Sequence, residues 1–462
     1  MSLPLFLVLL FSPPQAPPPP NPGEDRPLYG GVPAGPATGD VLDLTLRDAI
    51  ERGLQRNLGL LLGEQRVRAA QGARWEALSE LLPHLNFHLS ETRQKVNLEA
   101  FGFTAISGFP DIPPLVGPFN VFDVRAQLTD TVFAFGSYEK VRAERARIEA
   151  ARLSLKDVRE VVVLLSGDLY MRAVAEESRI DAARAQLATA RALHELAQDR
   201  KKAGLIPSLD VLRAEVERAR REQENIVAEA RLAKAKLSLA RAIGLPLGQQ
   251  FRLADRVPYS PAQILPLEEA VKTAYENRPD WKAAEARLRA AEAAKRSARG
   301  ERLPSLDVWG DYGALGATVG GARVTYTLGA ALRVPLFDGG KAIGKTLQAE
   351  AVLEGERASR EDLRARIRYE VESASLDLKA AQERVGVAER AMGLAKEELT
   401  QAQDRFQAGV ASNIDVVQAQ ESVASATESY IASLYDHNVA KAAMARVLGV
   451  AEATYKQILR GE

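Results

Sequence analysis

One short segment of the chain carries the residue types of a phosphate-binding loop. The stretch from Gly339 to Thr346 reads GGKAIGKT and fits the pattern G-x-x-x-x-G-K-[ST] between an expected strand and an expected helix. In that chemistry, backbone amides would surround phosphate oxygens, Lys345 would reach the terminal phosphates and Thr346 would hold magnesium. The preceding strand argues against it, because it alternates in polarity, whereas nucleotide-binding sheets are buried and continuously apolar. We therefore expect a strand-to-helix junction here, formed by Phe337, Asp338, Gly339 and Gly340.

The remaining reactive side chains form no recognisable catalytic or metal-binding set. The chain has four histidines and no cysteine, which excludes disulfides and thiolate metal ligands. His84 and His88 follow Pro83 on an expected strand, where a spacing of four residues spans about 13 Å. No Ser-His-Asp set and no carboxylate pair stands out. We therefore expect no enzyme activity, no metal site and no cofactor.

A turn motif occurs twice and gives the strongest functional indication in the chain. Ala-Gly is followed by Asp-Val at Gly204 and Asp210, and again at Gly409 and Asp415, 205 positions later. Glycine at such a place can adopt the left-handed conformation that ends a helix. Each aspartate then lies near the start of the next helix, where a carboxylate can cap free amides. Capping is therefore one role open to Asp210 and Asp415.

The turns belong to a duplication that covers most of the chain. Leu82-Pro83 and Leu303-Pro304 also repeat, 221 positions apart, so we expect a first repeat at 41–250 and a second at 251–462. Each repeat is expected to contain a helix, at about 44–82 and 265–302, then two strands and a long helical hairpin. Alternation of polarity predicts the strands, and heptad spacing of small and apolar residues predicts the hairpins. The expected strands are 84–96, 119–132, 305–315 and 323–336, and the expected hairpins are 137–242 and 341–448.

The composition and the N-terminus limit the classes of protein that fit. With 61 basic and 61 acidic residues the chain is neutral, so we expect no nucleic-acid partner. Residues 1–12 predict a degenerate signal sequence, with a frayed apolar terminus as the alternative. Residues 13–40 predict a Pro-rich linker. No later segment has 18 consecutive apolar residues, so we expect no transmembrane helix.

The strands predict a pore that requires several copies of the chain. Four strands cannot close a barrel alone, and an open four-stranded sheet has edges that invite aggregation. Strands of about ten residues with one apolar face suit a bilayer-spanning barrel. Three copies would supply twelve strands, which lies within the range of bacterial barrels. The expected fold is mainly α with four β-strands, internally duplicated, in a trimeric 12-stranded β-barrel that continues into an α-helical barrel.

The chain resembles the outer-membrane efflux protein family typified by TolC, over about 44–450. The resemblance rests on the duplicated unit, the two Leu-Pro steps, the segment Val334–Gly340 and the paired Ala-Gly…Asp-Val turns. It implies a homotrimer in the bacterial outer membrane, in contact with outer-membrane lipid and extending into the periplasm. It also implies a passive exit duct that works with a periplasmic adaptor (membrane fusion protein) and an inner-membrane transporter of the RND or ABC type.

The resemblance assigns roles to the two turns. In that family the hairpin ends form the periplasmic entrance and receive the adaptor, and here they carry Gly204, Leu205, Gly409 and Val410. The entrance is narrowed partly by aspartates on the second return helix. Asp415 matches the first of these, whereas Gln418 stands where the type member has a second aspartate. A single ring of carboxylates would favour cations less strongly than two such rings. Asp210 is the first-repeat counterpart of Asp415.

Two other classes of protein remain open at this point. A periplasmic adaptor of an export complex is also built from long hairpins and strands, but it has one hairpin between strand-rich halves. A coiled-coil scaffold would need neither detergent nor a barrel. Two hairpins with only four strands favour the exit duct over the adaptor.

Overall fold

The computed structural model of the chain describes residues 27–101, 113–255, 259–408, 410–411, 413–453 and 455. Three expectations concern residues outside this part. They are the signal-like stretch 1–12, residues 13–26 of the linker and the turn residue Gly409.

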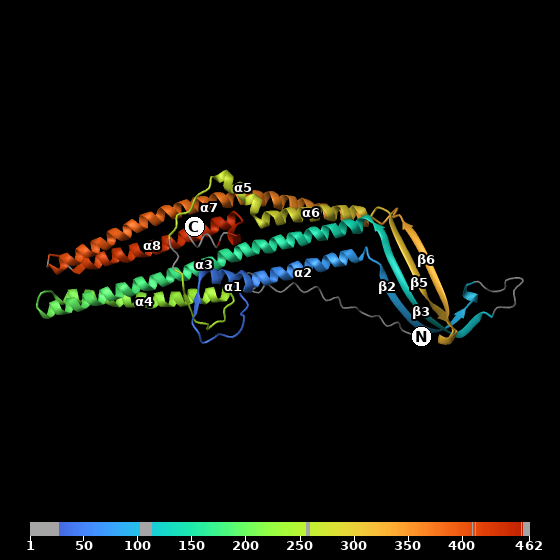
Figure 1. Ribbon diagram of the computed structural model, residues 1–462, viewed down its shortest axis with the longest axis horizontal. Coiled ribbons are helices and arrows are strands. Elements are labelled where there is room, and N and C mark those ends of the chain that lie inside the picture. The colour runs from blue at the N-terminus through green and yellow to red at the C-terminus, as the bar shows by residue number, and fades with distance from the viewer. Residues whose placement is uncertain are drawn as a thin grey trace, which may run out of the picture. The chain divides into compact units, whose positions relative to one another are not determined.

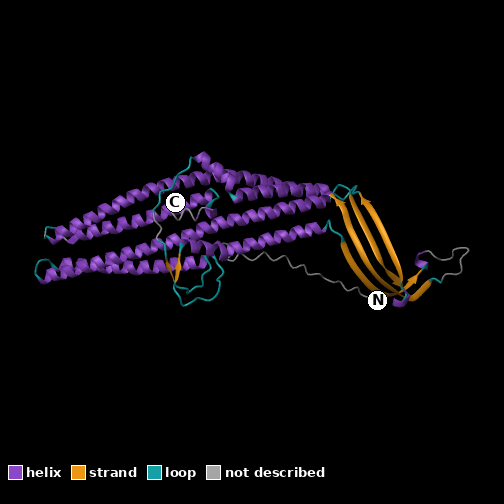
Figure 2. Ribbon diagram, viewed as in Figure 1, coloured by secondary structure: helices purple, strands orange, loops and turns teal. Residues whose placement is uncertain are grey.

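The same order of elements occurs twice along the chain: two helices, two strands, a very long helix and a return helix (Figure 1, Figure 2). The first set is α1 (Leu46–Arg56), α2 (Leu58–Ser79), β2 (His84–Asn97), β3 (Leu115–Ala134), α3 (Phe135–Lys202) and α4 (Ser208–Ala242). The second set is α5 (Leu267–Asn277), α6 (Pro279–Gly300), β5 (Ser305–Gly316), β6 (Arg323–Arg333), α7 (Lys341–Gln407) and α8 (Asn413–Val447). The shorter elements are η1 (Pro27–Tyr29), β1 (Leu42–Leu44), η2 (Glu99–Phe101), β4 (Phe251–Leu253) and η3 (Val319–Gly321).

The chain forms two compact units. The first unit draws its described residues from Met1–Leu61, Leu165–Pro258 and Arg390–Tyr435. The second draws them from Leu62–Leu164, Tyr259–Glu389 and Asp436–Glu462. Each unit therefore takes segments from both expected repeats, because α3 and α7, with 68 and 67 residues, each contribute to both units.

The second unit contains an antiparallel sheet in the order β2-β3-β5-β6 (Figure 1). The register places apolar side chains together on one face, since residues directly opposite each other point to the same side. Leu85 lies opposite Leu128, and Tyr312 lies opposite Tyr326. The apolar side chains of this face are largely exposed in the single chain: Leu85, Phe87, Leu89, Leu128, Tyr312, Val324, Tyr326, Leu328 and Leu332.

The other face of the sheet is polar and carries a network of charges. Arg125 Nη1 donates to Asp311 Oδ1 at 3.0 Å, and the same guanidinium also bonds Asp123. Thr131 donates to Asp307 across β3 and β5 at 3.0 Å. His88 lies opposite Arg125 and belongs to this polar face. The sheet thus separates an apolar surface from a hydrogen-bonded one.

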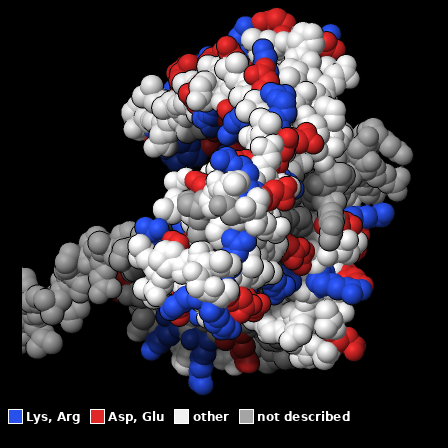
Figure 3. All heavy atoms as spheres, turned by 90° about the vertical axis from the view of Figure 1, so that its left-hand side faces the viewer, with Lys and Arg blue, Asp and Glu red and all other residues white. Residues whose placement is uncertain are grey.

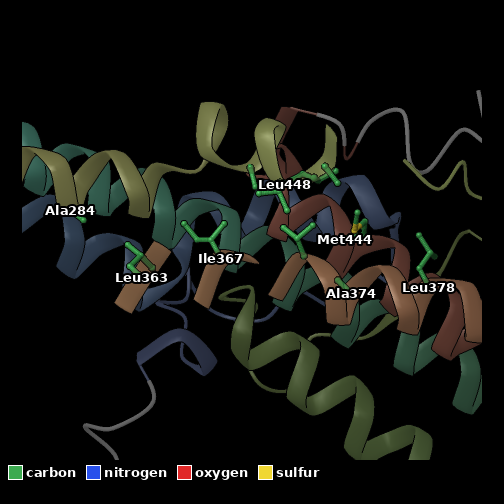
Figure 4. Packing of buried hydrophobic residues seen from close by; sticks show 11 residues of the cluster. Ala284, Leu363, Ile367, Ala374, Leu378, Met444 and Leu448 are labelled. Carbon is green, nitrogen blue, oxygen red and sulfur yellow. The ribbon is translucent and has the colours of Figure 1, made fainter. Parts of the chain in front are cut away.

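An apolar cluster in the second unit packs α5 and α6 against α7 and α8 (Figure 4). Ile367 and Val371 of α7 are fully buried, and they belong to the same cluster as Met444 of α8 and Leu448, which directly follows α8. Beside it, the buried Arg278 donates to Asp280 at 2.7 Å and to Glu370 at 2.6 Å. A buried cation with two carboxylate partners is costly to disrupt, so it fixes the α5–α6 joint.

In the first unit, β1 and β4 form a two-stranded parallel sheet that the sequence did not predict. The Tyr170 hydroxyl donates to Leu44 O at 3.0 Å and accepts from the Asp255 amide at 3.1 Å. Tyr170 is fully buried, and burial raises its pKa to about 12. The hydroxyl therefore keeps its proton, and its hydrogen bonds link β1 and the end of β4 to α3.

Several expected boundaries differ from the structure. The helix expected over 44–82 is broken at Asn57, a buried residue that donates to Leu28 O and, at 3.3 Å, to Ala242 O. Its counterpart in the second repeat is broken at Arg278, because the next residue, Pro279, has no amide hydrogen to donate within the helix. β6 ends at Arg333 instead of residue 336, since Pro335 cannot donate to the ladder. Among the helices that the structure describes, none has an apolar stretch of the length needed to span a bilayer.

Candidate functional site: the hairpin ends

The end of the first hairpin is a glycine turn stabilised by its own backbone. The Leu205 amide donates to Arg200 O at 2.9 Å, and the Gly204 amide donates to Lys201 O at 2.9 Å. This bonding pattern requires a left-handed residue, and Gly204 has φ of +74°. The Val410 amide donates to Arg405 O at 3.0 Å in the same way, so the second hairpin ends in an equivalent bond.

The turns present apolar side chains to solvent. Leu205 is 72% exposed and Val410 is 68% exposed. Seen from the side on which both turns lie, basic and acidic residues are interspersed and neither sign forms a continuous patch (Figure 3). A partner that binds here would therefore meet apolar side chains within a mixed-charge surface.

Arg200 connects the two hairpin ends, and the sequence reading did not single it out for this role. Its guanidinium donates to Phe406 O at 3.0 Å and to Gln407 O at 3.2 Å, and it lies 4.5 Å from the centroid of the Phe406 ring. These carbonyls belong to the last turn of α7, where they have no partner within the helix. Arg200 therefore caps α7 from α3. The available indication was the repeated arginine, Arg200 and Arg405, before each Ala-Gly turn.

Asp210 and Asp415 lie in the first turns of the return helices and Gln418 lies in the second turn of α8; of the three, Gln418 lines the groove found there. Asp210 pairs with Arg213 at 3.4 Å, three residues along α4. Asp415 is exposed in the first turn of α8. Gln418 lines an apolar groove between α4 and α8 whose other walls include Leu212 and Val216, whereas Asp210 and Asp415 do not line it.

Ion pairs join the two hairpins further along their length. Arg221 is buried, bonds Glu217 of its own helix at 2.8 Å and reaches Glu421 of α8 at 2.9 Å. The hydrogen bond from Arg220 lowers the pKa of Glu421, so this carboxylate stays ionised. Arg179 of α3 pairs with Glu428 at 2.9 Å. Charged contacts inside one chain therefore hold α8 against α3 and α4.

The junction between β6 and α7 has the form of a helix cap. Asp338 accepts from the amides of Gly340, at 3.0 Å, and Ala342, at 2.7 Å. These amide bonds hold the pKa of Asp338 below its ordinary value. Gly339 and Gly340 have φ of +66° and +87°, so the turn needs glycines. Phe337 is largely exposed. The first repeat has no such turn, since β3 ends at Ala134 and α3 begins at the next residue.

The phosphate-loop pattern has the geometry of a helix start. α7 begins at Lys341, and the Gly344 amide donates to Gly340 O at 3.0 Å. Lys345 pairs with Glu301, and the Thr346 hydroxyl donates to Ala342 O at 2.7 Å. The amides are thus used within the helix and do not form a cradle for phosphate oxygens.

Comparisons with known proteins give a family match for this chain and several similar structures. Residues 49–245 and 270–450 match the family described as outer membrane efflux protein. The chain is 24% identical over 420 residues to the pyoverdine export outer membrane protein OpmQ of Pseudomonas putida, covering 87% of this chain and 85% of that protein. Its fold is similar to the outer membrane protein VceC of Vibrio cholerae, with a TM-score of 0.74, 20% identity and coverage of 87% and 96%. It is also similar to the CmeC outer membrane channel of Campylobacter jejuni, with a TM-score of 0.78, 15% identity and coverage of 94% and 95%.

Proposed function

The chain belongs to the outer membrane efflux protein family, and we propose that it acts as a trimeric exit duct without enzymatic activity. It is located in the outer membrane of a Gram-negative bacterium and exports substrates that an inner-membrane transporter delivers. The same element order in both halves supports an internal duplication, so that three copies provide six equivalent hairpins.

The main support for a trimer is the pairing of strands in the sheet. Within the described residues β2 pairs on one side only, with β3, and β6 pairs on one side only, with β5. An unpaired edge strand is stabilised when it pairs with another edge strand, and closing the sheet into a barrel leaves no unpaired edge. Joining β6 of one copy to β2 of the next gives twelve strands from three copies. The exposed apolar face then meets lipid, and the polar face with Arg125 and Asp311 lines the lumen.

The hairpin ends are the proposed periplasmic entrance. Leu205 and Val410 are exposed there and offer apolar contacts to a periplasmic adaptor, with Gly204 and Gly409 in the turns. Asp415, Gln418 and Asp210 are proposed to line the entrance, from the beginning of α8 and of α4. The proposed inner-membrane partner is an RND or ABC transporter, which supplies the energy.

The alternative of a periplasmic adaptor or scaffold is not favoured, because the family match and the similar solved structures concern outer-membrane proteins. Phe337, Asp338, Gly339 and Gly340 are proposed to mark the point where the barrel joins the helical part. Their capped turn gives a rigid start to α7.

Measurements on detergent-extracted protein test the proposed duct directly. We expect a trimer by mass measurement and discrete single-channel currents in planar bilayers. Heat should unfold the barrel and change its migration on a gel. A monomer in detergent that produces no currents would contradict the proposal, as would a protein that remains in the soluble fraction without detergent.

A further inference from the structure

A pocket lined mainly by basic side chains lies between α3, α4 and α8 in the first unit. Its volume is about 410 Å³, which falls within the range of about 300–1,000 Å³ that is usual for small-molecule sites. Basic groups outnumber carboxylates among its charged lining residues, which are Arg172, Arg179, Arg231, Lys234, Glu176 and Glu428. We name it the cationic pocket.

The carboxylates of the cationic pocket neutralise only one of its basic groups. Both of them pair with Arg179, at 3.0 and 2.9 Å. In the part of the chain that the structure describes, the other three basic side chains have no ion pair and no hydrogen bond: Arg172, Arg231 and Lys234. Like charges that share a pocket repel each other, and a bound anion would relieve that repulsion.

The wall of the cationic pocket also contains a buried oxygen atom that has room for a donor. Glu176 is 8% exposed, and among the described residues no group donates a hydrogen bond to its Oε2 atom. Buried polar atoms in proteins normally have a hydrogen-bond partner. A ligand with a hydroxyl or N–H group beside its negative charges would supply this donor.

The cationic pocket faces away from the β1–β4 sheet. Tyr170 of α3 bonds β1, and Arg179, nine residues later, points to the opposite side of the helix. Lys236 of α4 donates to β4 at 3.4 Å, whereas Lys234, two residues earlier, is turned away by about 200°. A sheet inside a ring of helices would obstruct a duct. In the proposed assembly the sheet therefore lies outside the ring, and the pocket opens to the lumen.

The equivalent surface of the second repeat has the opposite charge. A pocket of about 470 Å³ between α7 and α8 is lined at many of the same positions, 205 residues later. Asp377 stands there in place of Arg172, and Asp436 stands in place of Arg231. Carboxylates outnumber basic groups in this second pocket. The excess of basic groups is therefore particular to the first repeat and is not a general property of the hairpins.

We propose that the cationic pocket binds small organic acids that carry several negative charges and a hydroxyl or N–H group, and that such acids are cargo of the duct. Arg172, Arg231 and Lys234 contact the acid groups, and Glu176 accepts from the hydroxyl or N–H. The cargo class rests on the proposed function, because only a duct brings cargo to this side of the helices.

Binding of citrate to the detergent-extracted protein tests the pocket. Tricarballylate has the same carboxylates as citrate and lacks its hydroxyl, so the two acids form a matched pair of probes. In equilibrium dialysis we expect citrate to bind more tightly than tricarballylate or sulfate. Arg172→Gln and Lys234→Gln should each weaken citrate binding about fivefold or more, because each removes a charged donor. Arg172→Asp, which reverses the charge as in the second repeat, should abolish it.

Lys201→Gln is the matched control, because Lys201 is exposed on α3 and does not line the cationic pocket. It removes the same charge and should leave citrate binding unchanged. Equal weakening by Lys201→Gln and Arg172→Gln would overturn the proposal, since binding would then follow the overall charge of the protein. Sulfate or tricarballylate binding as tightly as citrate would overturn the ligand class.

Single-channel currents separate the cationic pocket from the duct. Citrate should reduce the current through the unchanged protein and should have no effect on Arg172→Asp trimers, which still conduct ions. Currents that citrate leaves unchanged, despite binding in dialysis, would contradict the lumenal position and the cargo class. A chain that forms neither trimers nor channels would contradict the proposed function, whereas dialysis would still decide the pocket, because one copy of the chain forms it alone.

Discussion

The contact between Arg200 and the end of α7 predicts a measurable bias toward a closed entrance. Arg200 donates to Phe406 O at 3.0 Å and to Gln407 O at 3.2 Å, and it lies over the Phe406 ring, which is 5% exposed. Separating the hairpin ends must break all three interactions. The change Arg200→Met keeps a long side chain with good helix propensity and removes the guanidinium.

The size of the effect follows from the type of each interaction. Hydrogen bonds to a charged group contribute about 1.5–3 kcal/mol, and a cation–π contact at an exposed site adds about 0.5–1 kcal/mol. Arg200 is only half-buried, so solvent screening reduces their sum to about 1–2 kcal/mol. That energy corresponds to a factor of about 5–30 in the ratio of open to closed entrances.

Single-channel recording in planar bilayers measures this ratio as open probability. Lys202→Met is a matched control, because Lys202 pairs at 2.9 Å with Asp199 at the same helix end and both side chains are exposed. We expect the control to behave like the unchanged protein. An Arg200→Met trimer whose open probability stays within about twofold of the unchanged protein would refute the reasoning, because the closed entrance would then not depend on this cap.

Two further predictions concern ionisable groups. Asp415→Asn should weaken the preference for cations and Gln418→Asp should strengthen it, as measured by the reversal potential in a salt gradient; no shift in either variant would remove these positions from the entrance. Burial, together with the charge of Lys441, lowers the pKa of His437 below its ordinary value of 6.5. The unfolded chain therefore binds this proton more readily, so stability is complete above pH 6.5 and falls as the pH drops below it. His437→Phe should lose less Tm between pH 7.5 and 5.5 than the unchanged protein, and an identical loss would count against His437 as the cause.

The mainly helical class could be predicted from the sequence because long periodic segments carry a strong pattern. The alternation at Val324, Tyr326 and Leu328 likewise marks one face of a strand, and the register places these residues opposite β5. Rejecting the phosphate loop was also possible from context, since Lys345 and Thr346 are followed by a helix of 67 residues. In each case the information lies in neighbouring residues.

Features that depend on distant residues were not predictable. Asn57 caps the start of α2 locally, because its side-chain oxygen accepts from the Gly59 amide at 2.9 Å. Its position at the break also depends on a distant residue, since its side-chain amide donates to Ala242 O, 185 positions away. β1 and β4 have three residues each, which is too short for a period of two to be recognised. Pro279, by contrast, was a visible break in the helix expected after residue 265, and its meaning is local.

A third limit on prediction from the sequence comes from the internal repeat. Ile226 and Ile431, or Arg200 and Arg405, are identical residues at equivalent positions, so any reading of the sequence assigns them the same role. The structure separates them, because the burial of a side chain depends on what lies beside its helix and the neighbours of the two repeats differ within one chain.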